Sequence, residues 1–264
     1  MNNLKFAGII PARFASTRFP GKPLALIGGK TMIQRVYEQA STVLDNVYVA
    51  TDDERIANAV KNFGGKVIIT SPHHQSGTDR CYEALCNTGE RFDVVVNIQG
   101  DEPFIDPSQI KALMDCFDNT QTQIATMAKK ITSKDGLAYL ENPNHPKLVV
   151  NSNDEAMYFS RSVIPYLRGS DKNEWVTKHV FLKHLGIYAY RSDILAQITT
   201  LKPSTLELAE SLEQLRWLEN GFKIKVCYSD IETIGIDTPE DLEKANLIFT
   251  TDRQKIDLAK REAI

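Results

Sequence analysis

The chain has 264 residues, of which 42% are hydrophobic and 25% are charged, and its formal net charge is −3. These values are typical of a globular chain that can bury a sizeable core, and they argue against a general nucleic-acid binder. No apolar stretch reaches membrane-spanning length and the N-terminus lacks a signal-peptide pattern, so we expect a cytoplasmic protein without membrane partners.

The first predicted strand places a group of cations at its carboxyl end. Phe6 to Ile10 is a short apolar run typical of a buried strand, and Pro11 is expected to end it because proline has no N–H for a ladder. In open α/β sheets ligands bind at the carboxyl ends of strands. Because the loop that follows this strand is cationic, a phosphate chain is the predicted ligand. The alternative is a solvated loop with ordinary cations. The loop carries three cations and two hydroxyls: Arg13, Arg18, Lys22, Ser16 and Thr17.

Two further strands are predicted before residue 71, at Asn46 to Thr51 and at Lys66 to Thr70. Acidic residues follow the first of them at Asp52 to Glu54. Capping of the next helix and its dipole explain these acids better than a metal site does.

The next loop, Ser71 to Arg80, also follows a strand and precedes a helix. Its tripeptide Gln75 to Gly77 can approach a planar ligand closely and read the edge of a base. Thr78 is the predicted N-cap, with Arg80 near the first turn. The alternative is a polar connection with a good cap, and the adjacent His73-His74 pair is interpreted as loop residues without a metal.

The clearest strand is Asp93 to Gln99, a β-branched run typical of a central parallel strand. Asp101 follows it at the usual ligand position, where a carboxylate can hold Mg²⁺ against phosphate oxygens. Asp101 could instead cap the helix that begins near Pro107, but Asp106 is better placed for that cap.

The alternation of strands and helices predicts an α/β fold with a mostly parallel sheet covered by helices on both faces. We interpret residues 1–264 as a single domain. The rhythm changes from Ile124, which predicts an inserted smaller α+β subdomain at about residues 124–190. Four scattered cysteines without metal spacing indicate reduced structural thiols.

Three later segments add candidates. His184 to Tyr190 is a predicted strand with His184 and Tyr188 on one face. Leu206 to Leu218 is predicted as one helix with a largely solvated face. Asp237 precedes a closing helix, where it caps that helix or delivers a second carboxylate to the metal.

Several motifs recur together in the order found in one known family. They are PAR-x-x-STR-x-PGKPL (Pro11 to Leu24), HQSGTDR (His74 to Arg80), NIQGDEP (Asn97 to Pro103), YFSR (Tyr158 to Arg161), FLKHLGIYAYR (Phe181 to Arg191), LEQLRWLENG (Leu212 to Gly221) and GIDTPEDL (Gly235 to Leu242). Together they closely resemble the 3-deoxy-manno-octulosonate cytidylyltransferases, the CMP-KDO synthetases, over nearly the whole chain.

The resemblance implies the nucleotide-diphospho-sugar transferase fold, a Mg²⁺-dependent reaction of CTP with KDO, and a homodimer formed through the inserted subdomain. It implies nucleotide binding by Pro11, Ala12, Arg13, Ser16, Arg18, Lys22, Gln75, Ser76, Gly77, Arg80 and Asp101. It also implies metal binding by Asp101 and Asp237, and contact with the sugar acid by Gln99, Arg161, His184, Tyr188, Glu213 and Gln214.

In that reaction the anomeric hydroxyl of KDO attacks the α-phosphorus in line, and positioning and charge neutralisation dominate. The expected catalytic residues are Arg13, Lys22, Asp101 and Asp237. Two alternatives are the same chemistry on a variant sugar acid (8-amino-KDO or a sialic acid) and a non-catalytic CTP-binding sensor.

Overall fold

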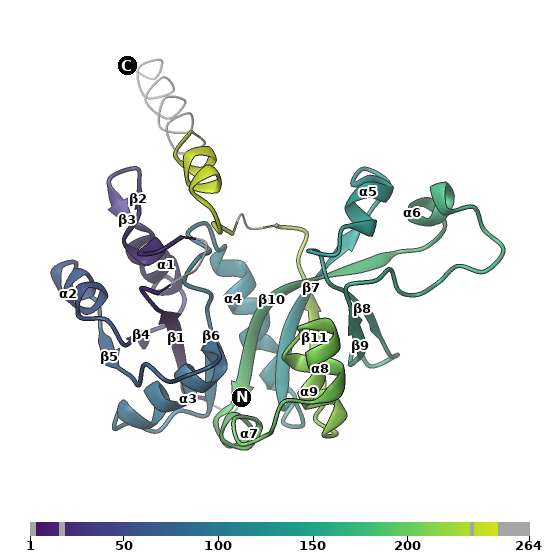
Figure 1. Cartoon of the computed structure of the whole chain (residues 1–264). Helices are drawn as coiled ribbons and strands as arrows, with labels where there is room; N and C mark the ends of the chain where they lie inside the picture. Colours follow the sequence, from purple (N-terminus) through teal and green to yellow (C-terminus); the bar gives the residue numbers. More distant parts are fainter. Residues whose placement is uncertain (1–3, 16–18, 233–234, 248–264) are drawn as a thin grey trace, which may run out of the picture. The chain divides into compact units, whose positions relative to one another are not determined.

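The structure is a computed structural model that describes residues 4–15, 19–232 and 235–247 (Figure 1). The chain forms two units. Unit 1 contains residues 1–6, 91–96 and 108–232, and unit 2 contains residues 7–90, 97–107 and 233–264. The predicted subdomain at about 124–190 lies inside unit 1, and its role stays a prediction.

Unit 2 contains three parallel strands in the order β1-β4-β5, which are β1 (Phe6–Ala12), β4 (Val47–Thr51) and β5 (Val67–Ile69). Gly8 lies opposite Val47, and Val49 lies opposite Val67. Every residue of β4 is buried, as expected for a parallel strand covered on both faces. Each of the three predicted strands is present within two residues of its expected bounds.

The expectation that Pro11 ends the first strand is wrong. Strand β1 continues to Ala12, with Pro11 opposite Ala50 in the register. Proline loses its donor, but its fixed φ is compatible with extended backbone and its carbonyl still accepts. The strand therefore carries two more residues toward its carboxyl end.

The α-helices α1, α2 and α3 of unit 2 begin at side-chain caps. Thr31, Asp53 and Ser76 each accept a hydrogen bond from a backbone N–H in the first turn that follows. The predicted cap at Asp53 is confirmed, whereas Thr78 is buried inside the first turn and is not the cap. The elements are η1 (Lys22–Leu24), β2 (Leu26–Ile27), β3 (Lys30–Thr31), α1 (Met32–Ala40), α2 (Glu54–Asn62) and α3 (Gly77–Asn87).

Unit 1 contains a mixed sheet. Strand β7 pairs in parallel with β11 and antiparallel with β10, and β8 pairs antiparallel with both β10 and β9. Its strands are β6 (Val94–Asn97), β7 (Ile124–Ile131), β8 (Lys147–Val150), β9 (Ala156–Ser160), β10 (Phe181–Arg191) and β11 (Ile224–Tyr228). Its helices are α4 (Pro107–Asp115), η2 (Cys116–Asp118), α5 (Gly136–Glu141), η3 (Lys172–Glu174), α6 (Trp175–Lys178), α7 (Ser192–Ile198), α8 (Thr205–Glu210) and α9 (Gln214–Glu219).

A bulge interrupts β10. The register against β7 shifts between His184 and Tyr188, and Gly186 has a φ of 66° that favours glycine. His184 lies opposite Ala128 and Tyr188 lies opposite Thr126, so the register shifts by two residues and the side chains of β10 keep their faces. The prediction that His184 and Tyr188 share one face is confirmed, since their ring centroids are 5.3 Å apart.

The single helix expected from Leu206 to Leu218 is two helices, α8 and α9. Ser211 between them adopts a left-handed conformation with a φ of 51°. Ser204 and Glu207 form a capping box at the start of α8, and Arg216 of α9 donates two hydrogen bonds to the Glu207 carboxylate. These charge-assisted bonds hold the two short helices against each other.

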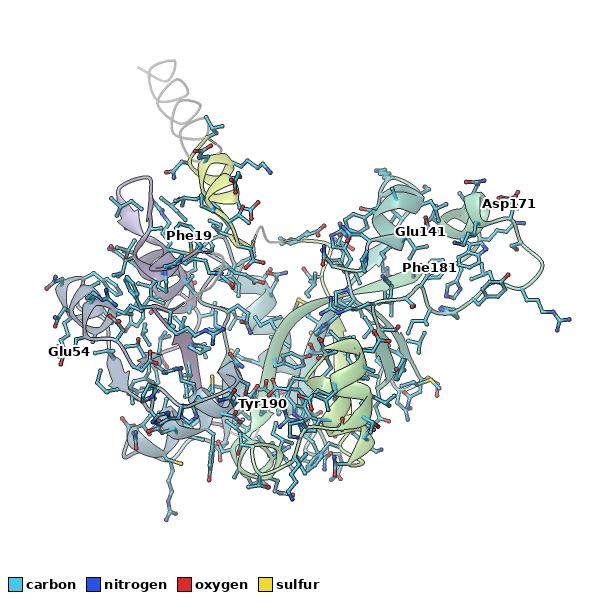
Figure 2. The ribbon with its side chains drawn as sticks, viewed as in Figure 1. Phe19, Glu54, Glu141, Asp171, Phe181 and Tyr190 are labelled. Carbon is cyan, nitrogen blue, oxygen red and sulfur yellow. The ribbon has the colours of Figure 1, made fainter. Side chains whose placement is uncertain are left out.

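Aromatic side chains fill much of the core of unit 1. Tyr190, labelled in Figure 2, is fully buried. It stacks on Tyr188, and both rings lie edge-on to Trp217. A separate cluster contains Trp175 and Phe181, whose rings are stacked 6.2 Å apart. Such aromatic pairs add to the apolar area that folding buries.

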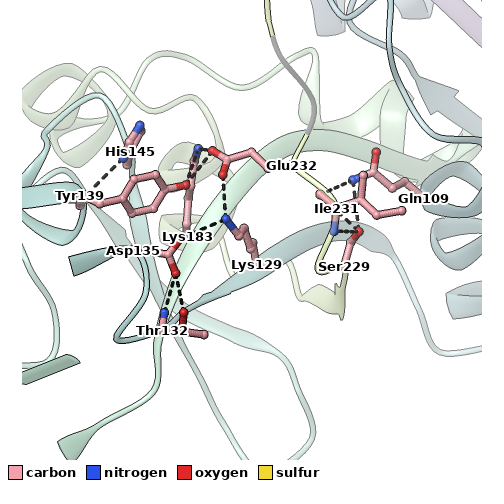
Figure 3. A network of polar contacts seen from close by, with 10 residues as sticks. All are labelled: Gln109, Lys129, Thr132, Asp135, Tyr139, His145, Lys183, Ser229, Ile231 and Glu232. Carbon is pink, nitrogen blue, oxygen red and sulfur yellow. Dashed lines mark hydrogen bonds and ion pairs between the residues drawn. The ribbon is translucent and has the colours of Figure 1, made fainter. Parts of the chain in front are cut away.

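A polar network in unit 1 surrounds Glu232 (Figure 3). Its carboxylate accepts hydrogen bonds from Lys129, at 2.8 Å, from Tyr139, at 2.6 Å, and from Lys183. Burial raises the pKa of the Glu232 carboxyl, but these hydrogen bonds outweigh burial and lower the pKa to about 2. Lys129 also pairs with Asp135, so the two lysines of the network are balanced by its two carboxylates.

We expect the Glu232→Gln variant to be less stable than the wild type at pH 7, by about 1–2 kcal/mol after allowance for solvent screening. The folded pKa lies below the ordinary value, so the contribution is complete above about pH 4.5 and is lost as the pH falls toward 2. Urea unfolding at pH 7 and pH 3 measures this, with Glu174→Gln in an exposed pair as the control. An equal destabilisation at both pH values would contradict the assignment.

Candidate active site

A cavity of about 270 Å³ lies in unit 2 at the carboxyl ends of its strands. It brings together eleven of the residues predicted from the sequence, which are Pro11, Ala12, Arg13, Lys22, Gln75, Ser76, Gly77, Arg80, Gln99, Asp101 and Asp237. Pro23, His74 and Gly100 also line it, and of these His74 was predicted only as a loop residue. Ser16 and Arg18 lie outside the described residues.

Two glycines let the walls of the cavity approach β1. A Cβ at Gly100 would lie 2.9 Å from the Pro11 carbonyl oxygen, and one at Gly77 would lie 3.3 Å from the Pro11 ring. A side chain at position 100 would therefore push the loop after β6 away from β1. Gly77 and Gly100 therefore set how closely the segments that contain them can approach Pro11.

Lys22 connects two carboxylates that are far apart in the sequence. Its Nζ donates to Asp101 Oδ2 at 2.8 Å and to Asp237 Oδ1 at 3.2 Å. The ammonium is largely buried, with 14% of the side chain exposed. The structure thus gathers the three residues at one point, and the role of the two acids as metal ligands stays a prediction.

Asp237 is held there by its neighbours in the chain. The backbone N–H of Ile236 donates to the Asp101 carbonyl at 2.9 Å, and the Ile236 side chain is fully buried. Thr238 Oγ1 accepts from the N–H of Asp241, so Thr238 caps the helix over residues 239–247. The Asp237 carboxylate accepts from Lys22.

Magnesium fits this donor set. Mg²⁺ usually takes one or two carboxylates and completes its shell with substrate phosphates and water. Two converging carboxylates match that pattern. Over residues 4–15, 19–232 and 235–247 no group of three or more His, Cys, Asp or Glu side chains could hold a metal alone, so phosphates would have to supply ligands.

Arg80, predicted to hold the cytidine, is anchored from behind. Its side chain is buried, and its two terminal nitrogens donate to Thr70 Oγ1 at 2.7 Å and to Asp52 Oδ2 at 3.2 Å. Neither partner was predicted from the sequence. Asp52 was interpreted together with Asp53 as an acid of the following helix, although it directly follows β4.

Five residues predicted to face the sugar acid belong to unit 1. His184 Nε2 lies 3.0 Å from Thr126 Oγ1, which donates to the Ile187 carbonyl, so the hydroxyl accepts from the imidazole. Burial lowers the pKa of His184 to about 3, and the ring is therefore neutral at pH 7. Burial also raises the pKa of the neighbouring Tyr188 phenol.

The other three lie around α8 and α9. Arg161 donates from all three guanidinium nitrogens to the backbone carbonyls of Glu210, Pro143 and Ser211. Gln214 is buried and its Nε2 has no hydrogen-bond partner in the described part of the chain, while Glu213 directly precedes α9. Gln99, the sixth of these residues, lines the cavity of unit 2.

None of the described helices is long and apolar enough to cross a membrane.

Comparison with known proteins gives a consistent result. The profile of the Cytidylyltransferase family matches residues 7–226. A 3-deoxy-manno-octulosonate cytidylyltransferase of Bacteroides thetaiotaomicron is 64% identical over 242 residues, which are 92% of this chain and 97% of the relative. An 8-amino-3,8-dideoxy-manno-octulosonate cytidylyltransferase of Shewanella baltica is 46% identical over 249 residues, covering 92% of this chain and 98% of that protein.

A solved CMP:2-keto-3-deoxy-manno-octonic acid synthetase complexed with CTP matches with a TM-score of 0.86 and 43% identity, over 94% of this chain and 99% of that one. This likeness confirms the predicted α/β class with a mostly parallel central sheet. The chain therefore belongs to the cytidylyltransferase family and, within it, to the 3-deoxy-manno-octulosonate cytidylyltransferases.

Proposed function

We propose that this chain transfers the cytidylyl group of CTP to KDO (3-deoxy-D-manno-octulosonate), releasing pyrophosphate and forming CMP-KDO for lipopolysaccharide synthesis. The observation that carries the proposal is the cavity of unit 2, in which a loop after β1 supplies Arg13 and Lys22 and two carboxylates stand opposite. A triphosphate needs cations and a divalent ion, and this is where both can be provided. The names of the relatives support the same reaction.

In the proposed reaction the anomeric hydroxyl oxygen of KDO forms a bond to the α-phosphorus. The bond from that phosphorus to the oxygen between the α- and β-phosphorus breaks, and this oxygen departs with pyrophosphate. The hydroxyl proton passes to solvent. Bound Mg²⁺, held by Asp101 and Asp237, would neutralise phosphate charge and help to orient the attacking oxygen. Lys22 and Arg13 stabilise the negative charge that grows on the departing pyrophosphate.

The remaining pocket residues bind and orient the nucleotide. Ser76 caps α3 with its hydroxyl, which leaves the N-terminus of that helix beside the cavity together with Gln75. Backbone N–H groups at a helix N-terminus are suited to anionic and carbonyl oxygens. The sugar acid has a carboxylate that requires donors. It is proposed to contact His184, Tyr188, Glu213, Gln214 and Arg161.

We expect purified protein to release pyrophosphate only when CTP, KDO and Mg²⁺ are all present, because the metal completes charge neutralisation at the phosphates. A coupled phosphatase assay measures the release, and EDTA should abolish it while added Mg²⁺ restores it. The same assay with 8-amino-KDO or a sialic acid identifies a variant substrate. CTP binding without turnover on any of the three sugars would instead favour a sensor.

The Lys22→Ala variant should lose at least about 100-fold in kcat, since it removes a cation aimed at the leaving group. Lys30→Ala in an exposed pair with Glu38 is the matched control and should keep the wild-type rate. Stopped assays at saturating CTP and KDO measure both variants, and circular dichroism checks their folding. An unchanged rate for Lys22→Ala would remove this residue from the reaction.

The proposal includes a cytoplasmic homodimer formed through residues 124–190. Three large apolar side chains of this segment are exposed, which are Met157, Tyr166 and Val180. Exposed apolar side chains of this size favour a protein contact. We expect Tyr166→Glu to be monomeric by light scattering at micromolar concentration, while Leu26→Glu, at an exposed apolar position of unit 2, should stay dimeric. A dimeric Tyr166→Glu protein would place the contact elsewhere.

A further inference from the structure

Arg80, Asp52 and Thr70 form a small cluster behind the cavity of unit 2, which we call the Arg80 cluster. Arg80 and Thr70 are buried and Asp52 is half-buried. The Arg80 side chain is 5% exposed, and the residue lines the cavity. One terminal nitrogen donates to the Thr70 hydroxyl at 2.7 Å and the other to the Asp52 carboxylate at 3.2 Å. Two different terminal nitrogens are thus tied to two fixed acceptors, which prevents the planar group from turning.

The sheet sets the spacing of the two acceptors. Asp52 directly follows β4 and Thr70 directly follows β5, and these strands are parallel neighbours with Thr51 opposite Ile69. The N–H of Thr70 donates to the carbonyl of Thr51 at 2.9 Å, so the strand ends stay paired up to the cluster. The orientation of the guanidinium is therefore determined by backbone pairing, which is more rigid than a surface ion pair.

Arg80 keeps donors for a ligand. A guanidinium has five N–H donors, and within the described part of the chain two of them are used by Thr70 and Asp52. The cavity beside it is also lined by Gln75 and Gly77, the residues expected to approach a planar group. A buried cation with unused donors at a cavity wall is suited to a ligand that presents adjacent acceptors.

We propose that Asp52 and Thr70 are positioning residues that aim Arg80 at the pyrimidine and so make the site select cytosine over uracil. The inference rests on the proposed function, since it takes CTP as the nucleotide. Cytosine presents two neighbouring acceptors, its O2 and N3, whereas uracil presents O2 beside an N3–H donor. An oriented guanidinium can satisfy both acceptors of cytosine, but it opposes the N3–H of uracil donor to donor, which is a repulsive contact.

A merely structural role of the cluster predicts something different. If Asp52 only compensates a buried charge, its loss lowers stability and weakens both nucleotides equally. If Asp52 orients Arg80, its loss removes the preference between them. The ratio of the two affinities separates these roles, because a uniform weakening leaves the ratio unchanged.

The test measures binding of CTP and of UTP, each with Mg²⁺ and without any sugar, by titration calorimetry on the full chain. We expect Asp52→Ala and Thr70→Val to reduce the CTP-over-UTP ratio by about 10-fold, mostly through weaker CTP binding, in line with loss of an oriented charged donor. Thr70→Ser keeps the hydroxyl and should keep the ratio. Asp52→Asn replaces Asp52→Ala if the latter does not fold.

The neighbouring Asp53 provides the matched control. It caps α2 and pairs with Arg55 on the surface, and it does not contact Arg80. Asp53→Asn should lower Tm by a few degrees and leave the ratio at the wild-type value. A selectivity change in this variant as large as that in Asp52→Ala would overturn the inference, because it would follow from general loosening of the strand end.

An unchanged ratio in folded Asp52 and Thr70 variants would also overturn it, as would a wild type that binds CTP and UTP equally. A wild type that prefers CTP but releases no pyrophosphate with any sugar acid contradicts the proposed function and leaves the selectivity result standing. A wild type that binds neither nucleotide contradicts both.

Discussion

The geometry of the cavity depends on one cation, the ammonium of Lys22, between two carboxylates. Asp101 and Asp237 stand 79 and 215 positions from it in the sequence, and two such acids would repel each other in a partly buried place without it. The contact is possible because Gly21 turns the chain ahead of η1 and because Ile236 is buried beside Asp237. Phosphate oxygens are equally good acceptors for an ammonium, so Lys22 can exchange a carboxylate for a phosphate without losing an anionic partner.

Many of the residues that build this cavity and its surroundings come from one edge of the sheet in unit 2. Parallel strands end on the same side of a sheet, and in unit 2 the segments after β1, β4 and β5 supply Arg13, Asp52 and Thr70. The residues that contact a ligand and the residues that orient them thus come from the same edge. Close approach then depends on residues without side chains, as at Gly100 against the Pro11 carbonyl. Loop chemistry and sheet geometry cannot be changed independently here.

Local patterns predicted most of the framework. The apolar runs of β1, β4 and β6 and the acids at the start of α2 follow from burial and capping, which act over a few residues. The failures share a different cause. Ser211 takes a left-handed conformation and splits α8 from α9, and a bulge shifts the register of β10 against β7. Both depend on the packing of distant segments, which periodicity does not contain.

The candidate site shows the same division. The cations of the first loop and the acid after β6 were visible as charged residues at strand ends. Asp237 was visible as either a helix cap or a second carboxylate, and the resemblance favoured the second of these. Asp52 was visible too, but adjacent acids before a helix have a sufficient local explanation in capping, and only the structure separates them. Asp53 caps α2, and Asp52 turns to Arg80.

The two acids differ in their place along the chain. Asp52 directly follows β4, at the strand end beside the cavity, whereas Asp53 is the N-cap residue of α2 and its carboxylate accepts from the first turn of that helix. A buried arginine requires a carboxylate partner, since an uncompensated guanidinium would be expensive to bury. Arg80 lies beside the cavity, is held at two nitrogens and has further donors. This arrangement fits a guanidinium whose orientation selects the ligand that binds there.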